Sequence, residues 1–270
     1  MSAIAAWGWP VLLGVLGAVF GSFIAVVAIR WPAGRRATRG RSACDSCARS
    51  LTAAELIPVL SFLVQRGKCR HCQATIPPSH VVTEIAGLAI GVIAGLAVPG
   101  LQGAAGALFG WLLLALAALD LAAFWLPNAL NAALAVAGLA TGAFALGPPL
   151  ADRVIGGAGG FAVLWLVARG YKAARGRQGL GGGDPKLFAA IGCWLGWQDL
   201  PLVLLAASLI GLAAVLGMMC AGRRVRATDR LPFGVMLAAG AWTVWLAPHL
   251  VPPSPLPGST MILARVPDAH

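Results

Sequence analysis

The chain has 270 residues, of which 59% are hydrophobic and 11% are charged, and its mean hydropathy is +0.83. A soluble domain has about 25% charged residues, so the composition excludes an ordinary soluble protein. The net charge of +11 does not indicate nucleic-acid binding, because 18 of the 20 Lys and Arg residues lie in three clusters, at 30–70, 169–186 and 223–230. Clusters of this kind mark the cytoplasmic loops of membrane proteins.

Eight apolar segments are candidates for transmembrane helices, by length and composition. They are residues 6–29, 81–98, 102–125, 128–146, 153–170, 185–198, 200–221 and 231–249. The first has no basic residue before Arg30, so we expect a retained helix and not a cleaved signal peptide. If the N-terminus is outside, all three basic clusters fall on internal loops. The sixth segment is the least typical, because it is short for a crossing.

Two cysteine pairs lie in the only substantial extramembrane segment, residues 30–80. Cys44 and Cys47 form the first CxxC pair, and Cys69 and Cys72 form the second. Their spacing resembles that of a four-thiolate zinc site, and a reducing cytoplasmic face disfavours disulfides. Four thiolates leave no open position for water, so we expect a structural ion. A redox pair or four unrelated thiols are the alternatives.

The sequence therefore predicts an all-α polytopic membrane protein with about eight transmembrane helices and a small cytoplasmic zinc-binding loop domain. Four regions follow from this interpretation: a first transmembrane helix at 1–29, the cysteine loop domain at 30–80, a seven-helix membrane domain at 81–249 and a flexible C-terminal tail at 250–270.

Two of the nine acidic residues adjoin the apolar segments at the same predicted membrane face. Asp120 lies near the cytoplasmic end of the third segment, and Asp184 begins the sixth. Placing a carboxylate next to the membrane interior costs free energy, so the presence of two of them suggests that they have a function. Asp184 precedes Pro185, so helix capping is the alternative, while Asp120 has no cationic neighbour in sequence and needs a partner from elsewhere. Glu84, a third acid at this face, is explained by the favourable dipole of a helix start.

Paired carboxyls suggest a specific chemistry. Two carboxyls that share a site do not both ionise easily, so one holds a proton while the other acts as a base on water. This is the arrangement of an aspartic protease. Other means of peptide hydrolysis are poorly represented, since HExxH and GxSxG are absent. The non-enzymatic alternative is an ion relay in a zinc-containing membrane assembly or transport subunit.

Five stretches together resemble a known family. They are GSFIAVVAIRWP at 21–32, the two CxxC pairs, DLAAFWLPN at 120–128, GGGDPKLFAAIGCWLGW at 181–197 and LPFGVMLAAG at 231–240. Their combination resembles the bacterial prepilin leader peptidase/N-methyltransferases of the GxGD aspartic protease class, and it covers about residues 20–245.

The resemblance implies a bacterial inner-membrane enzyme, with its N-terminus outside and its active site facing the cytoplasm. Such an enzyme cleaves the basic leader of type IV prepilins and type II secretion pseudopilins after a glycine. It then methylates the new N-terminal residue from S-adenosylmethionine. The expected partners are prepilins, pseudopilins and membrane lipid, without nucleic acid.

The resemblance also assigns residues. It implies that Asp120 and Asp184 are the catalytic pair, that Gly181 and Gly183 are the glycines of the GxGD motif, and that the four cysteines hold structural zinc. Motif support is expected from Pro127, Asn128 and Lys186.

One position departs from the family pattern. Ala25 stands where the family usually has asparagine, in a region tied to methyl transfer. A peptidase without methyltransferase activity is therefore an alternative. The chain has no Rossmann fingerprint, so the sequence assigns no residue to the methyl-donor site.

Overall fold

The computed structural model describes residues 3–35, 42–224, 226 and 230–250. This part of the chain is all-helical, as predicted, and its only β-type pairings are two isolated bridges. Apart from Leu250, the predicted C-terminal tail at 250–270 lies outside the described residues.

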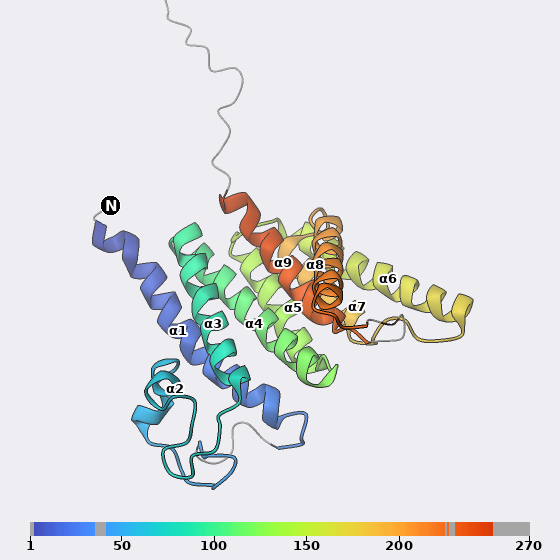
Figure 1. The fold of residues 1–270 in the computed structure, drawn as a ribbon. Helices are drawn as coiled ribbons and strands as arrows, with labels where there is room; N and C mark the ends of the chain where they lie inside the picture. The colour runs from blue at the N-terminus through green and yellow to red at the C-terminus, as the bar shows by residue number, and fades with distance from the viewer. Residues whose placement is uncertain (1–2, 36–41, 225, 227–229, 251–270) are drawn as a thin grey trace, which may run out of the picture.

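Eight helices coincide with the eight predicted segments to within a few residues (Figure 1). They are α1 (Ala3–Arg30), α3 (Pro78–Ala97), α4 (Leu101–Ala123), α5 (Asn128–Ala143), α6 (Leu150–Arg175), α7 (Asp184–Leu195), α8 (Leu200–Cys220) and α9 (Phe233–Leu250). Six of them are long and apolar enough to cross a membrane, with the candidate span of α1 beginning at Trp7. The exceptions, α5 and α7, are shorter than a typical span.

The short helix α7 lies inside the bundle. It packs against α5, α6 and α9, and ten of its twelve residues are buried. A Cβ atom on Gly192 would collide with the carbonyl oxygen of Gly156, so α7 and α6 approach at backbone distance. A helix enclosed in this way is apolar on every side without facing lipid. This explains why the hydropathy of α7 resembles that of a transmembrane segment although the helix is short.

The N-terminal helix pair, α1 and α3, is also held together by glycines. A Cβ on Gly17 would collide with the carbonyl oxygen of Gly87, and the reverse also holds. Small residues let membrane helices approach closely. Trp111 of α4 donates a hydrogen bond to the carbonyl of Gly87 at 3.0 Å and stacks on Phe20. The pair is thereby attached to the rest of the bundle through α4.

The segment between α1 and α3 contains the short helices η1 (Ala53–Leu56) and α2 (Leu60–Val64), neither of which has a buried residue. Figure 1 shows this segment gathered at one end of α1 and α3. We call residues 42–77 the cysteine loop. It has too few buried side chains to form a hydrophobic core of its own.

Arg153 of α6 is 1% exposed, and sequence reasoning assigned it no role. No salt bridge joins it to an acid within the described residues. Its guanidinium instead donates to backbone carbonyls at 2.6–3.3 Å, those of Gly138, Leu146, Pro148 and Cys193. These carbonyls belong to the C-terminal parts of α5 and α7 and the turn before α6. Arg153 therefore joins three parts of the bundle at one point.

Candidate functional site

Asp120 lies in the last turn of α4 and is 5% exposed. Helix α4 ends at Ala123, and the following residue, Phe124, adopts a left-handed conformation with φ 49°. The Oδ2 atom of Asp120 accepts a hydrogen bond from the backbone N–H of Val235 at 3.1 Å. Val235 lies in the first turn of α9, where the helix dipole favours a negative group. The partner that was missing from the sequence neighbourhood of Asp120 is thus a distant helix N-terminus.

Asp184 is the first residue of α7 and is also 5% exposed. Its Oδ2 atom accepts a hydrogen bond from the backbone N–H of Gly181 at 2.9 Å. The N-cap position belongs to Gly183, and no side chain caps this helix. The capping interpretation of Asp184 is therefore wrong, because the carboxylate turns back to hold the glycine segment before the helix.

The fold brings Asp120, at the end of α4, and Asp184, at the start of α7, to the neighbourhood of Leu126. A Cβ on Gly183 would lie 2.7 Å from the Cβ of Leu126. A Cβ on Gly234 would lie 3.1 Å from Leu126 Cδ1 and 2.8 Å from Asp120 Oδ2. Leu126 therefore lies between two glycines that border the pair, and neither glycine position has room for a side chain.

The three residues expected to support the pair lie beside it. Lys186 donates from Nζ to Oδ1 of Asn128 at 2.8 Å, which joins the first turns of α7 and α5. Pro127 is the N-cap residue of α5. Asn131, which is 4% exposed, donates from Nδ2 to the carbonyls of Pro127 at 3.2 Å and Leu126 at 3.4 Å. The turn that follows Asp120 is therefore fixed by hydrogen bonds from one turn further along α5.

The four cysteines also converge. Their sulfur atoms all lie within 4.8 Å of one another, and the Sγ atoms of Cys44 and Cys72 are 3.8 Å apart. Tetrahedral zinc with bonds of about 2.3 Å to sulfur separates its ligands by about 3.8 Å. The donor set and its spacing thus fit one tetrahedral thiolate-bound ion. His71 is not part of this cluster.

The two cysteine pairs sit in matching turns. The backbone N–H of Cys44 bonds to the carbonyl of Arg49 at 3.0 Å, and that of Cys69 bonds to Ala74 at 2.9 Å. The residue after each second cysteine has positive φ, 57° and 56°. Backbone hydrogen bonds from Cys72 and His71 lower the pKa of Cys69 to about 6. One thiol of the cluster therefore ionises readily, whereas the pKa of its neighbour Cys72 is raised to about 11.

Glu84 differs from its expected role. It lies in the second turn of α3, is 8% exposed, and accepts a hydrogen bond from the backbone N–H of Val59 at 2.7 Å. Val59 has φ 62°, which is unusual for a β-branched residue. The dipole explanation is therefore insufficient, because Glu84 holds the cysteine loop against α3.

Sequence reasoning missed four residues around these sites: Glu84, Asn131, Gly234 and Val235. The LPFGVMLAAG stretch contained the signal for the last two, since it was among the five motifs. For Asn131 the signal was an amide in an otherwise apolar segment just after the Pro127 break.

Comparisons with known proteins divide the chain into two parts. The model described as the bacterial Peptidase A24 N-terminal domain matches residues 15–98, and the Type IV leader peptidase family matches residues 107–216. The first range contains the four cysteines and Glu84, and the second contains Asp120 and Asp184.

Curated proteins named "Prepilin leader peptidase/N-methyltransferase" are similar over most of the chain. One from Burkholderia pseudomallei (strain K96243) is 39% identical over 84% of this chain and 81% of its own. One from Aeromonas salmonicida (strain A449) is 39% identical over 76% of this chain and 71% of its own. One from Pseudomonas aeruginosa is 34% identical over 86% and 88%. No solved structure matches.

Proposed function

The chain belongs to the type IV leader peptidase family, and on that premise we propose that it is an enzyme that removes the leader of prepilins and methylates the new N-terminal residue. The observation that carries the proposal is the burial of both Asp120 and Asp184 near Leu126, in a site built from α4, α7 and α9. The name of the relatives includes both activities.

We assign the peptidase chemistry to this pair. One carboxylate takes a proton from water, whose oxygen attacks the scissile carbonyl carbon, while the other carboxyl gives its proton to the carbonyl oxygen. The carbon–nitrogen bond then breaks, and the leaving amine takes up a proton. Each aspartate accepts one backbone hydrogen bond, from Gly181 or Val235. These bonds orient the carboxylates without neutralising them.

Several neighbours support the pair in this proposal. At Gly183 and Gly234 the backbone itself borders the aspartate pair, because a side chain at either position would press on Leu126. The Lys186–Asn128 hydrogen bond holds the first turns of α7 and α5 in register. A prepilin whose apolar helix lies in the membrane would present its scissile bond at this end of the bundle.

We propose that the site faces the cytoplasm of a bacterial inner membrane and that the N-terminus is outside. The three basic clusters support this orientation, because Lys and Arg accumulate on cytoplasmic loops. The cysteine loop and the aspartate pair belong to the same end of the bundle. Trp31, just after α1, contacts Trp125, just after Asp120, with ring centroids 5.3 Å apart.

We further propose that the loop domain at 30–80 is organised by structural zinc on Cys44, Cys47, Cys69 and Cys72. The sulfur spacing supports this, and four thiolates leave no position for a reacting water. The membrane domain at 81–249 would then contain the peptidase pair.

For the second activity, S-adenosylmethionine is the proposed methyl donor. The amine left by cleavage gives its electron pair to the methyl carbon, the carbon–sulfur bond breaks toward sulfur, and the amine releases a proton. Ala25, at the position that departs from the family pattern, is 2% exposed and packs inside the bundle.

The test is the intact mass of a type IV prepilin or pseudopilin after incubation with the full-length protein and S-adenosylmethionine. A product without its leader and heavier by one methyl group is expected. Cut but unmethylated product would restrict the function to peptidase activity. Uncut substrate would contradict the proposal and favour the ion-relay alternative.

A further inference from the structure

Three apolar side chains of the short helix α2 form one exposed face. Leu60, Leu63 and Val64 are three and four positions apart, so they lie on one side of the helix. They are 59–67% exposed, and Ile57, just before α2, is 46% exposed. We call Leu60, Leu63 and Val64 the α2 face. Exposed apolar groups that gather in one place indicate a contact with another apolar partner.

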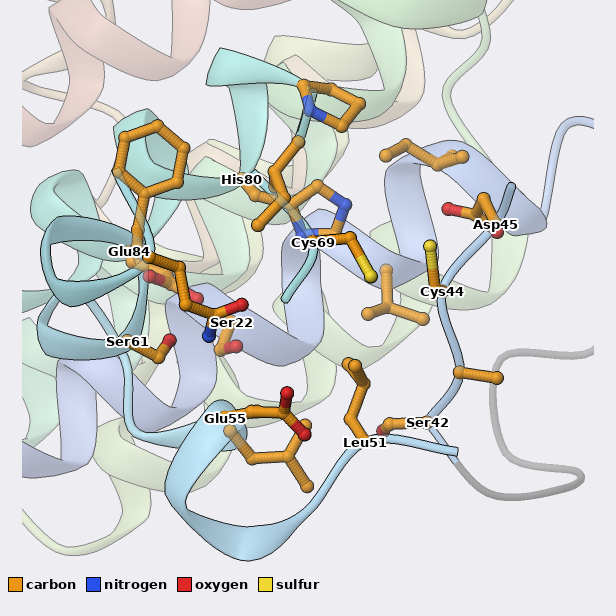
Figure 2. Close-up of a pocket in the computed structure, with 18 of the residues that line it drawn as sticks. Ser22, Ser42, Cys44, Asp45, Leu51, Glu55, Ser61, Cys69, His80 and Glu84 are labelled. Carbon is orange, nitrogen blue, oxygen red and sulfur yellow. The ribbon is translucent and has the colours of Figure 1, made fainter. Parts of the chain in front are cut away.

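The opposite side of α2 faces the protein. Ser61 and Phe62 line a cavity of about 410 Å³ together with Ser22 and Phe23 of α1. Figure 2 shows Ser61 and Ser22 on the same side of this cavity. One side of α2 thus closes a space beside α1, and the α2 face takes no part in its lining.

The helix α2 lies beside a candidate membrane span and not beyond its end. Val59, which precedes α2, donates its backbone N–H to Glu84 at 2.7 Å, and Glu84 is the seventh residue of α3. At 1.5 Å per residue, Glu84 is about 9 Å along α3 from its first residue. Since α3 has 20 residues, about the number that a crossing needs, α2 begins at the level of the membrane interface. Figure 1 shows α2 beside this end of α3.

The part of α3 at this level is itself exposed and apolar. Val82 is 61% exposed and Ile85 is 49% exposed, on either side of the buried Glu84. Apolar side chains at the end of a span are covered by lipid. Lipid-facing groups therefore occur at the same level as the α2 face.

Exposed cations follow the α2 face in the sequence. Arg66, Lys68 and Arg70 lie within six residues of Val64, and all three are exposed. Arg30, the last residue of α1, adds a fourth positive charge at this end of the bundle. In the part of the chain that the structure describes, none of the four takes part in a salt bridge.

The acids of this region are fewer, and they are engaged elsewhere. Residues 42–77 contain four basic and two acidic residues. Each acid near α2 has another partner: Asp45 forms an ion pair with Arg35 at 3.7 Å, Glu55 accepts hydrogen bonds from Thr52, and Glu84 accepts one from Val59. The surroundings of the α2 face are therefore net positive and complement an anionic surface.

We propose that α2 anchors the cysteine loop to the membrane: the α2 face enters the boundary between headgroups and acyl chains of an anionic bilayer, and Arg66 and Lys68 bind lipid phosphates. An apolar face with cations beside it is typical of elements that lie on a membrane without crossing it. A soluble partner would have to displace headgroups to reach this level of α3. The anchor gives the loop the apolar burial that it lacks internally, and neither the aspartate pair nor methyl transfer takes part in it.

The experiment is hydroxyl-radical footprinting of the full-length protein, with oxidation of each residue measured by mass spectrometry. The protein is placed in nanodiscs of phosphatidylethanolamine and phosphatidylglycerol, at one copy per disc. Leu209 of α8 is the internal reference, because it lies in a candidate span and is 57% exposed, close to the 62% of Leu63. We expect Leu63 to be oxidised as slowly as Leu209.

A double charge reversal tests the cations. Arg66→Glu combined with Lys68→Glu should raise the oxidation rate of the α2 face by at least about threefold, because anionic headgroups then repel the loop. Arg223→Glu combined with Arg224→Glu makes the same change of charge in another basic cluster. This matched control should leave the oxidation of the α2 face unchanged. Slow oxidation of the reference leucine in each variant shows that the bundle is still inserted.

Three results would contradict the proposal. At one copy per disc, oxidation of Leu63 as fast as that of a leucine in an unfolded peptide would overturn the anchor. Protection that appears only at two copies per disc would overturn it in favour of a second copy of the chain as the occupant. Protection that the charge reversal at Arg66 and Lys68 leaves unchanged would overturn the role of anionic lipid. Prepilin cleavage does not enter these measurements, so the anchor and the proposed function fail separately.

Discussion

The aspartate pair lies among completely buried side chains, whereas the cysteine loop has almost no core. Around the pair, Leu187 and Ile191 of α7 are completely buried. In the cysteine loop, Cys69 is the only buried residue between 42 and 77. Interdigitated side chains hold the first site, and the loop relies on its four thiols and the hydrogen bond to Glu84.

Because the two regions are held by different interactions, mutations in one should have little effect on the other. A perturbation of packing in α4, α7 and α9 should act on cleavage, and a perturbation of the four thiols or of Glu84 should act on the structure of the cysteine loop. Effects at distant sites without shared partners add independently. The Trp31–Trp125 contact is one described place where a change on one side touches the other.

The largest expected effect is on the pair itself. Asp120→Asn or Asp184→Asn should each lower the rate of prepilin cleavage by about a thousandfold, because an amide can act neither as base nor as proton donor here. The rate is measured by gel shift of the pilin. Near-normal cleavage by either variant would refute the dyad.

The second effect is on stability alone. Arg153→Met leaves several buried carbonyl groups without a donor, and we expect a loss of about 3 kcal/mol or more in the free energy of unfolding. Thermal denaturation in micelles measures it, with the exposed Arg169→Met as the control. A midpoint equal to that of the control would show that Arg153 is not the clamp between α5, α6 and α7.

The third effect should be confined to the loop. Cys69→Ser removes one ligand, so metal content by mass spectrometry should fall and limited proteolysis within 42–77 should accelerate. The rate of cleavage should stay within about threefold of the parental rate. A collapse of cleavage would show that the two sites are not independent.

The smallest effect distinguishes two adjacent glycines. Gly183→Ala places a Cβ 2.7 Å from Leu126, and such overpacking should lower the cleavage rate by about tenfold. Gly182→Ala is the matched control, since nothing lies within 4 Å of its Cβ position. Equal rates for the two variants would mean that the glycine segment serves only as a linker.

The helices could be predicted from the sequence because hydropathy is a local property, and all eight segments were found. The short helix α7 was recognised as atypical, but its position inside the bundle depends on glycine contacts with α6. Such contacts join residues distant in sequence, and a single sequence does not reveal them.

The residues of the site divide in the same way into those that local sequence predicts and those that depend on contacts between distant segments. The spacing of the two CxxC pairs predicted the cysteine cluster, and the places of Asp120 and Asp184 beside apolar segments, together with the family resemblance, predicted the aspartate pair. The hydrogen bond that Asp120 accepts comes from the backbone N–H of Val235, which belongs to another helix. Glu84 was assigned to the helix dipole because its hydrogen bond to Val59 becomes visible only in the folded loop.

The most direct measurement is the intact mass of pilin after incubation with the parent and Asp184→Asn proteins in the presence of S-adenosylmethionine. We predict cut and methylated pilin for the parent and uncut pilin for Asp184→Asn. Fully cut pilin from Asp184→Asn would contradict this prediction.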